Sequence, residues 1–529
     1  MTWVPPISLP DDFNAADYFV DRQIREGREG KIAIECGDLR VSYGELFARV
    51  NQLGNGLRSL GVRIEDRVLL LLLDTPEFAI SFFGAIKIGA VPVPVNTLLK
   101  PADYKYLLNN SRTRIAIVSD SLLPLIDAIP RKELRFLETV VVVGGSARGA
   151  VTFEELVRGS AMELEAAATR KDDPAFWLYS SGSTGQPKGC VHLQHDMVVS
   201  TERYAKAILR ISESDRFFSV AKLFFAYGLG NGLYFPLAVG ATSILLPGPP
   251  RPQAVFEIIE RHRPTLFFSV PSNYVKLLTH AAACERKFDL STVRHAISAG
   301  EALPAAVFHQ FKEHFGVEIL DALGSTEALH MMISNVPGGV RPGSSGRVLP
   351  GFEARIVDDQ DQPVATGEIG SLLVKADSTC AYYWNEHEKT KDTVHGHWLR
   401  TGDKYHQDAD GYFWYAGRTD DMMKVSGAWV SPIEIERVLM EHPKVLEVAV
   451  VFRPDADGFS KPAACVVLLD GIPSDPSLAR ELQEFVLERL PVYKRPHWVD
   501  FLAELPKTAT GKVQRFKLRH ASAVDPLGA

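Results

Sequence analysis

The stretch Tyr179-Ser-Ser-Gly-Ser-Thr-Gly-Gln-Pro-Lys-Gly189 carries the strongest fold signal in this chain of 529 residues. Its three glycines permit positive φ angles and close approach of a ligand to the backbone. Its four hydroxyl groups and Lys188 can bind phosphate oxygens, with help from exposed backbone N–H groups. Because Lys188 is followed by glycine rather than Ser or Thr, the stretch is not a Walker A loop. An apolar, strand-like run at 176–179 precedes the glycines, so we interpret the stretch as a phosphate-binding loop and not as a flexible surface loop.

On the N-terminal side of this loop, helix-like and strand-like patterns alternate. Ser42 and Glu45 form the pattern of a capping box, and apolar residues then recur at helical spacing as far as Gly61. The pattern next predicts a strand at 68–73, a helix at 76–87, a strand at 90–95, a helix at 101–110 and a strand at 114–118. Beyond the loop, 264–271 and 294–300 are again strand-like. The alternation predicts an α/β fold in which helices cover both faces of a sheet.

Toward the C-terminus the pattern changes twice. Residues 338–351 are rich in Gly, Pro and Ser and predict a loop, and short strands with turns follow from 353 to about 415. After a boundary near 418–421, a second capping box at 431–434 starts a helix, and strands at 445–452 and 463–469 and a helix at 478–490 follow. We therefore expect a large N-terminal domain at 1–419 with a β-rich subdomain at about 340–419, and a small, mobile α+β domain at 420–529.

The composition describes an ordinary globular chain, 46% hydrophobic and 23% charged, which excludes collagen-like, coiled-coil and largely disordered proteins. Lys and Arg number 58 against 65 Asp and Glu, a formal net charge of −7, which disfavours sequence-independent binding of nucleic acid. The start of the chain lacks the pattern of a signal peptide. The apolar run Val68–Leu73 is far shorter than the roughly 18 residues of a membrane span. We expect a soluble, cytoplasmic protein without a nucleic-acid or membrane partner, and the sequence is compatible with a homodimer.

Five cysteines lie at least 85 positions apart, so the chain has no C-x-x-C pair. This spacing argues against a zinc site or a disulfide framework. We expect reduced thiols that are mostly buried.

Five further motifs follow the loop in order: Ser298-Ala-Gly-Glu301, Gly324-Ser-Thr-Glu327, Thr401-Gly-Asp403, Gly417-Arg-Thr-Asp-Asp421 and Pro506-Lys-Thr-Ala-Thr-Gly-Lys512. With these motifs, nearly the whole chain resembles the adenylate-forming superfamily of acyl- and aryl-CoA synthetases, luciferases and peptide-synthetase adenylation domains. The resemblance implies that the protein uses ATP and Mg²⁺ as cofactors and CoA as a co-substrate. Because activation of a carboxylate by ATP brings two anions together, such a site must neutralise charge and align the reactants, and it needs no covalent nucleophile.

The resemblance also implies individual roles at the nucleotide. Thr326 contacts phosphate, Glu327 holds Mg²⁺, and Lys512 bridges the carboxylate and phosphate oxygens in the adenylation transition state. Asp403 binds the ribose hydroxyls, and Arg418 supports it with a charged hydrogen bond. The remaining nucleotide-binding residues implied are Ser180, Ser181, Gly182, Ser183, Thr184, Gly185 and Lys188 at the phosphates, and Gly300, Glu301, Ala302, Asp321, Leu323 and Gly324 at the adenine. Many relatives have Tyr at position 323, so here an apolar contact replaces an aromatic stack.

In this superfamily the small domain rotates between the two half-reactions. Asp420 matches the hinge position. After rotation, the loop around Gly427 approaches the acyl-adenylate, and a glycine there leaves room for the pantetheine arm. Phe225 matches the aromatic gate over the carboxylate.

The acid pocket is predicted from the segment 222–231 and the residues that follow Gly324. Amino-acid-activating relatives carry Asp directly after the aromatic gate, whereas this chain has Ala226, so an amino acid is disfavoured. The expected lining is small, flat-sided and mostly apolar, which suits a benzene ring: Phe225, Ala226, Tyr227, Gly324, His330 and Met331. His330 either hydrogen-bonds a ring substituent or only packs.

The segments Phe-Phe-Ala-Tyr-Gly-Leu-Gly-Asn and Ser-Thr-Glu-Ala-Leu-His resemble the benzoate-CoA ligase branch of the superfamily. The resemblance implies an ATP-dependent ligase that converts benzoate or a simple substituted benzoate, ATP and CoA into the aroyl-CoA, AMP and pyrophosphate. Alternatives are a ligase for 4-hydroxybenzoate or aminobenzoate, an enzyme that loads an aryl group onto a carrier protein, and a luciferase-like oxygenase, whose bulky substrate the small pocket disfavours. A non-catalytic nucleotide-binding regulator would be expected to lack Lys512 or Glu327, and both are present.

Overall fold

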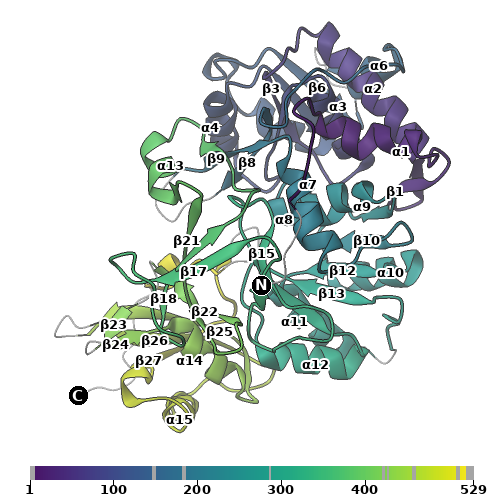
Figure 1. Ribbon diagram of the computed structural model, residues 1–529. Coiled ribbons are helices and arrows are strands. Elements are labelled where there is room, and N and C mark those ends of the chain that lie inside the picture. The colour runs from purple at the N-terminus through teal and green to yellow at the C-terminus, as the bar shows by residue number, and fades with distance from the viewer. Residues whose placement is uncertain are drawn as a thin grey trace.

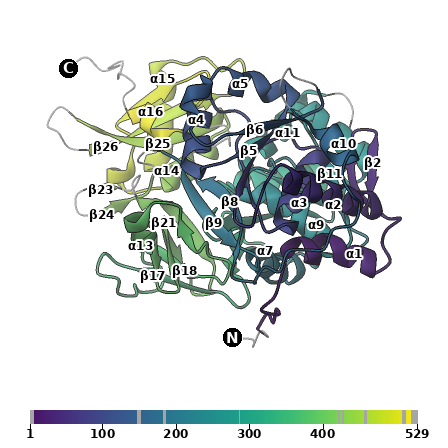
Figure 2. The same ribbon diagram turned by 90° about the horizontal axis from the view of Figure 1, so that it is seen from above.

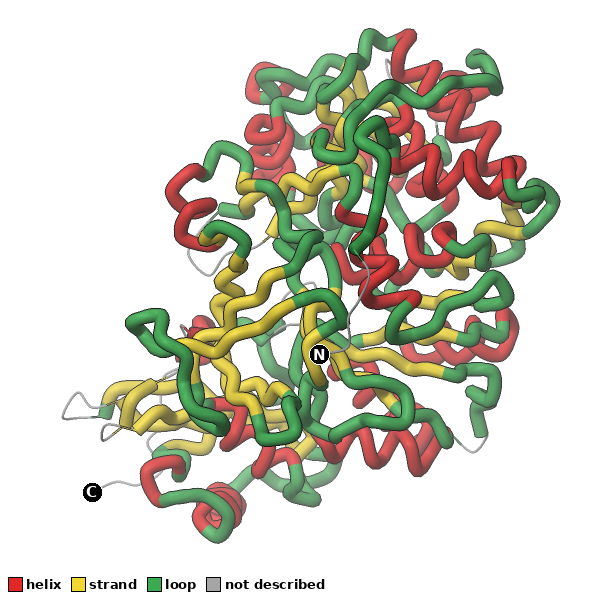
Figure 3. The backbone as a smooth tube through the Cα atoms, viewed as in Figure 1, coloured by secondary structure: helices red, strands yellow, loops and turns green. Residues whose placement is uncertain are grey.

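The computed structural model describes residues 6–145, 151–180, 186–284, 287–419, 423–425, 428–455, 460–507 and 513–519 (Figure 1). The chain forms a mixed α/β structure with several sheets, and the C-terminal elements gather at one side of the molecule (Figure 2). Helices and strands alternate through the N-terminal part, whereas strands dominate the region that follows (Figure 3).

The first sheet is entirely parallel, in the order β4-β3-β5-β6-β7. Its strands are β3 (Arg67–Leu71), β4 (Val91–Pro94), β5 (Ile115–Ser119), β6 (Thr139–Val143) and β7 (Val151–Thr152), and the helices of this region are α2 (Tyr43–Ser59), α3 (Pro76–Lys87), α4 (Pro101–Ser111), α5 (Leu123–Asp127) and α6 (Phe153–Arg158). In β3, Val68 and Leu70 face one hydrophobic cluster, and Leu69 and Leu71 face another. Successive side chains of a strand point to opposite faces, so both faces of this sheet are buried, as predicted for a parallel sheet covered by helices.

The second sheet has nine strands in the order β16-β15-β14-β13-β12-β10-β11-β1-β2. These are β1 (Ile32–Cys36), β2 (Leu39–Ser42), β10 (Arg216–Ser219), β11 (Thr242–Leu245), β12 (Leu266–Ser269), β13 (His295–Ser298), β14 (Ile319–Gly324), β15 (Met331–Ser334) and β16 (Arg347–Val348). Helices α10 (Pro252–His262), α11 (Pro271–Ala283) and α12 (Ala305–Phe315) contribute to the cluster on one face, and the large core lies on the other. The loop predicted at 338–351 contains the edge strand β16, because two of its residues pair with β15.

Two smaller sheets complete the N-terminal part. Strands β8 (Pro174–Ser180), β9 (Lys188–Leu193) and β19 (Tyr382–Tyr383) form a three-stranded sheet in the order β19-β9-β8. The predicted β-rich region forms an antiparallel sheet of β17 (Glu353–Val357), β18 (Gly370–Lys375), β20 (Val394–His395), β21 (Trp398–Gln407) and β22 (Phe413–Arg418), with the helix α13 (His387–Thr393) between β19 and β20. A group of short helical segments around 196–238 lies next to these sheets and includes α7 (Asp196–Ser200), α8 (Ala226–Leu229), η5 (Gly230–Tyr234) and α9 (Phe235–Ala238).

The C-terminal part has its own hydrophobic core, which identifies it as a small domain. Its elements are the hairpin β23 (Met423–Val425) and β24 (Ala428–Val430), helices α14 (Pro432–Met440), α15 (Pro476–Leu487) and α16 (Arg515–Arg519), and strands β25 (Val445–Pro454), β26 (Ser460–Leu468) and β27 (Trp498–Phe501). The domain boundary at 419/420 stays a prediction, because Asp420 lies outside the described residues.

The two predicted capping boxes differ in the structure. At α2, Oγ of Ser42 accepts from the Glu45 N–H at 3.1 Å, and the Glu45 carboxylate accepts from the Ser42 N–H at 2.7 Å, so the box is complete. At α14, Oγ of Ser431 accepts from the Glu434 N–H at 3.3 Å, but the Glu434 carboxylate binds Nζ of Lys494 at 2.6 and 2.7 Å. The prediction of the second capping box was therefore only partly correct. The Ser431 side chain caps the helix, but the Glu434 carboxylate forms an ion pair with Lys494 instead of accepting from the Ser431 N–H.

All five cysteines are free, and three of them, Cys190, Cys380 and Cys465, are buried. In the described part of the chain, no helix is long and apolar enough to cross a bilayer.

Candidate functional site

The predicted phosphate loop connects two paired strands. Ser180 ends β8, Lys188 begins β9, and the two residues lie opposite each other in the hairpin. Two hydrogen bonds tie the base of the hairpin to α4: the Tyr106 hydroxyl donates to the Pro187 carbonyl at 3.0 Å, and the Tyr179 hydroxyl donates to Oδ1 of Asn110 at 2.7 Å. The loop residues Ser181, Gly182, Ser183, Thr184 and Gly185 lie outside the described residues, so their roles stay predictions.

The residues predicted at the adenine gather at the carboxyl ends of two parallel strands. Ser298 at the end of β13 pairs with Asp321 in β14, and Gly300, with a φ of +92°, follows directly with Glu301 and Ala302. In open α/β sheets, ligands bind at this edge. Burial raises the pKa of Asp321 to about 8. Its Oδ1 is buried and has no hydrogen-bond partner within the described ranges, which fits an atom that a ligand amine completes.

The segment that holds Thr326 and Glu327 begins where β14 ends, at Leu323 and Gly324. The Glu327 carbonyl accepts from the Cys380 N–H at 2.7 Å, and its carboxylate oxygen Oε1 accepts from the Tyr383 hydroxyl at 2.8 Å. Burial, reinforced by the Glu327 charge, raises the pKa of Tyr383, so this tyrosine stays a donor. Cys190 also contacts Oε1, with its Sγ 3.9 Å away.

The Glu327 carboxylate fits a Mg²⁺ site of one protein ligand. Both side-chain contacts described above meet Oε1, and Oε2 has no hydrogen-bond partner among the residues that the structure describes. Mg²⁺ is typically held by one or two carboxylates together with substrate phosphates and water. Clusters of three or more His, Cys, Asp or Glu side chains that could hold a metal do not occur within the described ranges, so a dedicated protein cage is not present there.

Asp403 and Arg418 lie opposite each other in the antiparallel pair β21–β22. Nη1 of Arg418 donates to Oδ1 of Asp403 at 3.0 Å and to the Thr401 carbonyl at 3.1 Å. The predicted hydrogen bond between the two side chains is therefore present. Gly402 has a φ of +75°, and an added Cβ would lie 2.8 Å from Nη2 of Arg418, so glycine is required in this turn.

Three of the residues predicted to line the acid pocket lie at the start of α8. Phe225 is the residue before the helix, Ala226 begins it, and the hydroxyl of Tyr227 donates to the Ser269 and Ile297 carbonyls at 3.1 and 3.2 Å. These bonds tie the helix to the carboxyl ends of β12 and β13. The same edge of the sheet therefore positions both the residues predicted to bind the nucleotide and those predicted to line the acid pocket.

His330, also predicted to line the pocket, is buried. Its ring is 4.5 Å from the ring of Phe235 and 5.8 Å from that of Tyr227, centroid to centroid. Burial lowers the pKa of His330 to about 3, so the imidazole is neutral at physiological pH. Nε2 lies 3.2 Å from Oδ1 of Asn231, whereas Nδ1 of His330 and Nδ2 of Asn231 are buried without hydrogen-bond partners in the described structure.

Gly230 and Gly324 have no side chains, and this provides the space in which His330 lies. An added Cβ at Gly230 would lie 2.5 Å from Cδ2 of His330, and one at Gly324 would lie 2.7 Å from the His330 carbonyl oxygen. Gly324 pairs with Met331, which follows the histidine in β15. The structure brings His330 together with Tyr227, Gly324 and Asn231, which ends the predicted segment 222–231. Tyr204 and Phe235 join them, although the prediction did not include these two residues.

Three further predicted functional residues, besides those of the phosphate loop, lie outside the described residues: Lys512, Asp420 and Gly427. Their roles as transition-state lysine, hinge and pantetheine-passage glycine stay predictions.

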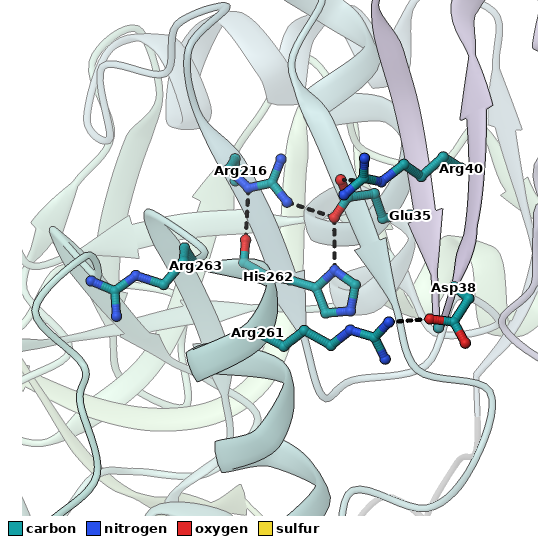
Figure 4. A pocket seen from close by; sticks show the side chains of 8 residues that line it. Glu35, Asp38, Arg40, Arg216, Arg261, His262 and Arg263 are labelled. Atoms are coloured by element: carbon teal, nitrogen blue, oxygen red, sulfur yellow. Dashed lines mark hydrogen bonds and ion pairs between the residues drawn. The ribbon is translucent and has the colours of Figure 1, made fainter.

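A separate polar cavity of about 510 Å³ lies at the other end of the nine-stranded sheet, next to β1 and β2 (Figure 4). Glu35, which is buried, accepts from Nη2 of Arg216 at 2.5 Å and pairs with Nδ1 of His262 at 2.7 Å. Burial opposes ionisation of Glu35, but these two partners outweigh it and hold its pKa below the usual value. Arg261 pairs with Asp38, and Arg263 pairs with Asp289. Because these charges are paired with one another, we interpret the residues around the cavity as ion pairs that join β1, β10 and α10, and not as a ligand site.

Family models match the chain on both sides of the predicted boundary. The model for the AMP-binding enzyme covers residues 20–384, and the model for the AMP-binding enzyme C-terminal domain covers 434–512. This chain belongs to the AMP-binding enzyme family.

Relatives of this AMP-binding enzyme match it over nearly their full length. The benzoate–CoA ligase of Thauera aromatica is 47% identical over 98% of both chains. The 4-hydroxybenzoate–CoA/benzoate–CoA ligase of Rhodopseudomonas palustris is 44% identical over 96% of this chain and 94% of its own. Among solved structures, the anthranilate CoA ligase AuaEII in complex with anthranoyl-AMP superposes with a TM-score of 0.92, at 44% identity and 97% coverage of each chain. The fold of a large N-terminal and a small C-terminal domain is thereby confirmed.

Proposed function

We propose that this AMP-binding enzyme is an ATP-dependent benzoate–CoA ligase. It joins benzoate, or a simple substituted benzoate, to CoA through an aroyl-adenylate and releases AMP and pyrophosphate. One arrangement carries this proposal: the residues that we assign to the acid pocket, among them the buried and neutral His330 packed on Phe235, lie at the same sheet edge as the residues that we assign to the nucleotide. The full-length similarity to aryl-acid CoA ligases supports it.

The first half-reaction requires the benzoate oxygen to attack the α-phosphate. In our proposal, Asp403 binds the ribose, Asp321 meets the adenine amine, and Thr326 and Lys188 contact phosphate oxygens. Lys512 completes the site by placing a positive charge between the two anions, where it stabilises the transition state. When bound at Glu327, Mg²⁺ neutralises phosphate charge.

The second half-reaction requires the CoA thiol to reach the acyl carbon. We propose that the small domain rotates about Asp420, that Lys512 leaves the site, and that the Gly427 loop admits the pantetheine arm beside Phe225. A homodimer and a cytoplasmic location stay predictions from the sequence.

The test is to measure pyrophosphate and CoA-thioester formation with ATP, Mg²⁺ and a panel of benzoate, hydroxybenzoates, aminobenzoates, cinnamate and medium-chain fatty acids. We expect the highest kcat/KM with benzoate or a simple substituted benzoate, and a thioester product. Pyrophosphate release without thioester formation would instead indicate loading of a carrier protein. A preference for fatty acids would contradict the pocket assignment.

A second substrate class is favoured by one observation. Nδ1 of His330 and Nδ2 of Asn231 provide an acceptor and a donor that have no partners in the described structure. A hydroxyl or amino group on the ring can satisfy such groups. Turnover of a hydroxybenzoate or aminobenzoate above that of benzoate would select this alternative.

Replacement of His330 by Ala is expected to change ring selectivity. Removal of the imidazole opens space beside Gly230, so kcat/KM for benzoate should fall about tenfold while that for bulkier methyl- or aminobenzoates falls less or rises; one pocket methylene is worth roughly 1–3 kcal/mol. Steady-state kinetics on matched benzoates measure the ratio. The KM for ATP is the internal control, since His330 lies in the acid pocket, and a parallel loss for every ring acid would contradict the assignment.

A further inference from the structure

His192 links the two parts of the proposed phosphate site. It lies in β9, four residues after Lys188, and its side chain is fully buried. Its Nε2 lies 2.8 Å from the carbonyl oxygen of Thr326, and its ring stacks on Phe176 of β8 with centroids 5.2 Å apart. Because a carbonyl oxygen can only accept, Nε2 carries the proton and donates a hydrogen bond to the Thr326 carbonyl.

Asp196 holds the other side of the imidazole. Oδ2 of this buried aspartate lies 2.9 Å from Nδ1 of His192 and also accepts from the Leu193 N–H at 3.0 Å. His195 approaches the other oxygen, with Nε2 3.2 Å from Oδ1. The imidazole is therefore fixed in orientation by contacts on both nitrogens and on one face.

The bond to Thr326 reaches the backbone at the point where the proposed phosphate contact and the proposed Mg²⁺ ligand are adjacent. Glu327 is already held by the Cys380 N–H at its carbonyl and by Tyr383 at its carboxylate, and both of these partners lie in or beside β19. Strand β19 pairs with β9. The three-stranded sheet β19-β9-β8 thus holds both the base of the phosphate loop and the 326–327 segment.

We propose that His192, oriented by Asp196, is a positioning residue that sets Thr326 and Glu327 relative to the phosphate loop. The proposal rests on the proposed function, because the tasks of Thr326 and Glu327 are part of it. A shift of about 1 Å in a positioned group can cost about 100-fold in rate. Loss of the His192 bond should therefore reduce the phosphate chemistry of adenylation more than the transfer of a preformed acyl group to CoA.

The experiment compares the two half-reactions in His192→Leu and His192→Gln. His192→Leu removes both nitrogens, whereas His192→Gln keeps an amide N–H that can donate to the Thr326 carbonyl. For His192→Leu we expect kcat/KM for ATP in ATP–pyrophosphate exchange to fall about 10- to 100-fold. We expect thioester formation from added benzoyl-adenylate and CoA to stay within about threefold, and His192→Gln to recover most of the exchange activity.

The matched control is His195→Leu, which removes the other histidine at Asp196 without touching the 326–327 segment. It should lower exchange far less than His192→Leu. A merely structural role for His192 would lower both half-reactions equally and would leave His192→Gln no better than His192→Leu, and that result would overturn the proposal.

Two further measurements keep the proposal testable. If His192→Leu does not fold, as judged by circular dichroism, the same comparison is made with His192→Gln and Asp196→Asn, and equal losses in both half-reactions would overturn the proposal. If the wild type shows no exchange with any aryl acid, the proposed function fails. Calorimetric titration of MgATP then tests the positioning role alone, because His192→Leu, which loses the bond to Thr326, should bind MgATP more weakly than His195→Leu does.

Discussion

Replacement of Lys512 by Ala should lower the rate of adenylation about 100- to 1,000-fold, the range for removal of one group that stabilises a transition-state charge. The expected loss is large because benzoate and the α-phosphate are both anions, and Lys512 is the residue that our proposal places between them. Thioester formation from added benzoyl-adenylate should remain close to wild type, because Lys512 leaves the site before that step. Rapid-quench measurement of the two half-reactions separates these effects.

Lys507→Ala is the matched control for this variant. Lys507 belongs to the same motif, but both oxygens of Glu447 hold its Nζ, at 2.6 and 2.7 Å. Its charge is therefore committed to an ion pair within the small domain, and its loss should change adenylation no more than about threefold, as for most partly exposed pairs. Full adenylation activity in Lys512→Ala, or equal losses in the two variants, would remove Lys512 from the proposed mechanism.

Glu327→Gln should give the second large effect, a fall in adenylation of about 100-fold or more. A bound metal ion supplies several kcal/mol of charge stabilisation, and about 1.4 kcal/mol corresponds to a factor of ten in rate. Glutamine keeps the acceptor for the Tyr383 hydroxyl, so the change removes the negative charge and preserves the contact. The measurement is adenylation rate as a function of Mg²⁺ concentration, with the half-saturating concentration expected to rise.

Tyr383→Phe tests the same site with a milder change than Glu327→Gln. It removes the hydrogen bond to Oε1 and keeps the carboxylate, so a smaller loss is expected; a hydrogen bond to a charged group is worth about 1.5–3 kcal/mol. Calorimetry of ATP with and without Mg²⁺ gives a readout that does not depend on turnover. An unchanged Mg²⁺ dependence in Glu327→Gln would contradict the assignment of the metal to this carboxylate.

Sequence periodicity predicted the N-terminal elements well where one local signal decided them. The helix predicted at 76–87 matches α3 residue for residue, because Pro76 starts it and the apolar face continues to its end. The complete capping box at Ser42 is also local, since both of its hydrogen bonds join residues three positions apart. At Ser431 the same pattern failed in part, because the acidic side chain of Glu434 is bound by Lys494, 60 positions after Glu434.

In the functional site, too, local motifs were predicted and long-range contacts were not. The order of the motifs along the chain predicted that Asp321, Thr326, Glu327, Asp403 and Arg418 belong to the nucleotide site. The structure brings Asp403 and Arg418 into direct contact. The sequence carried no sign that Tyr383 holds Glu327, since the two residues are separated by 56 positions. It placed Asn231 and His330 in the same predicted pocket, but the contact between them comes from the structure. His192 could have been noted only as a histidine close to the phosphate loop, without its partner.

The sequence by itself determined the family, the alternation of helices and strands, and the residue types available for nucleotide and acid. These follow from short motifs and from periodicity, which depend on neighbours along the chain. Only the tertiary structure decided which side chains hold the motif residues in place. That support comes from β19, nearly 200 positions beyond β9, because strand pairing brings together segments that no local pattern connects.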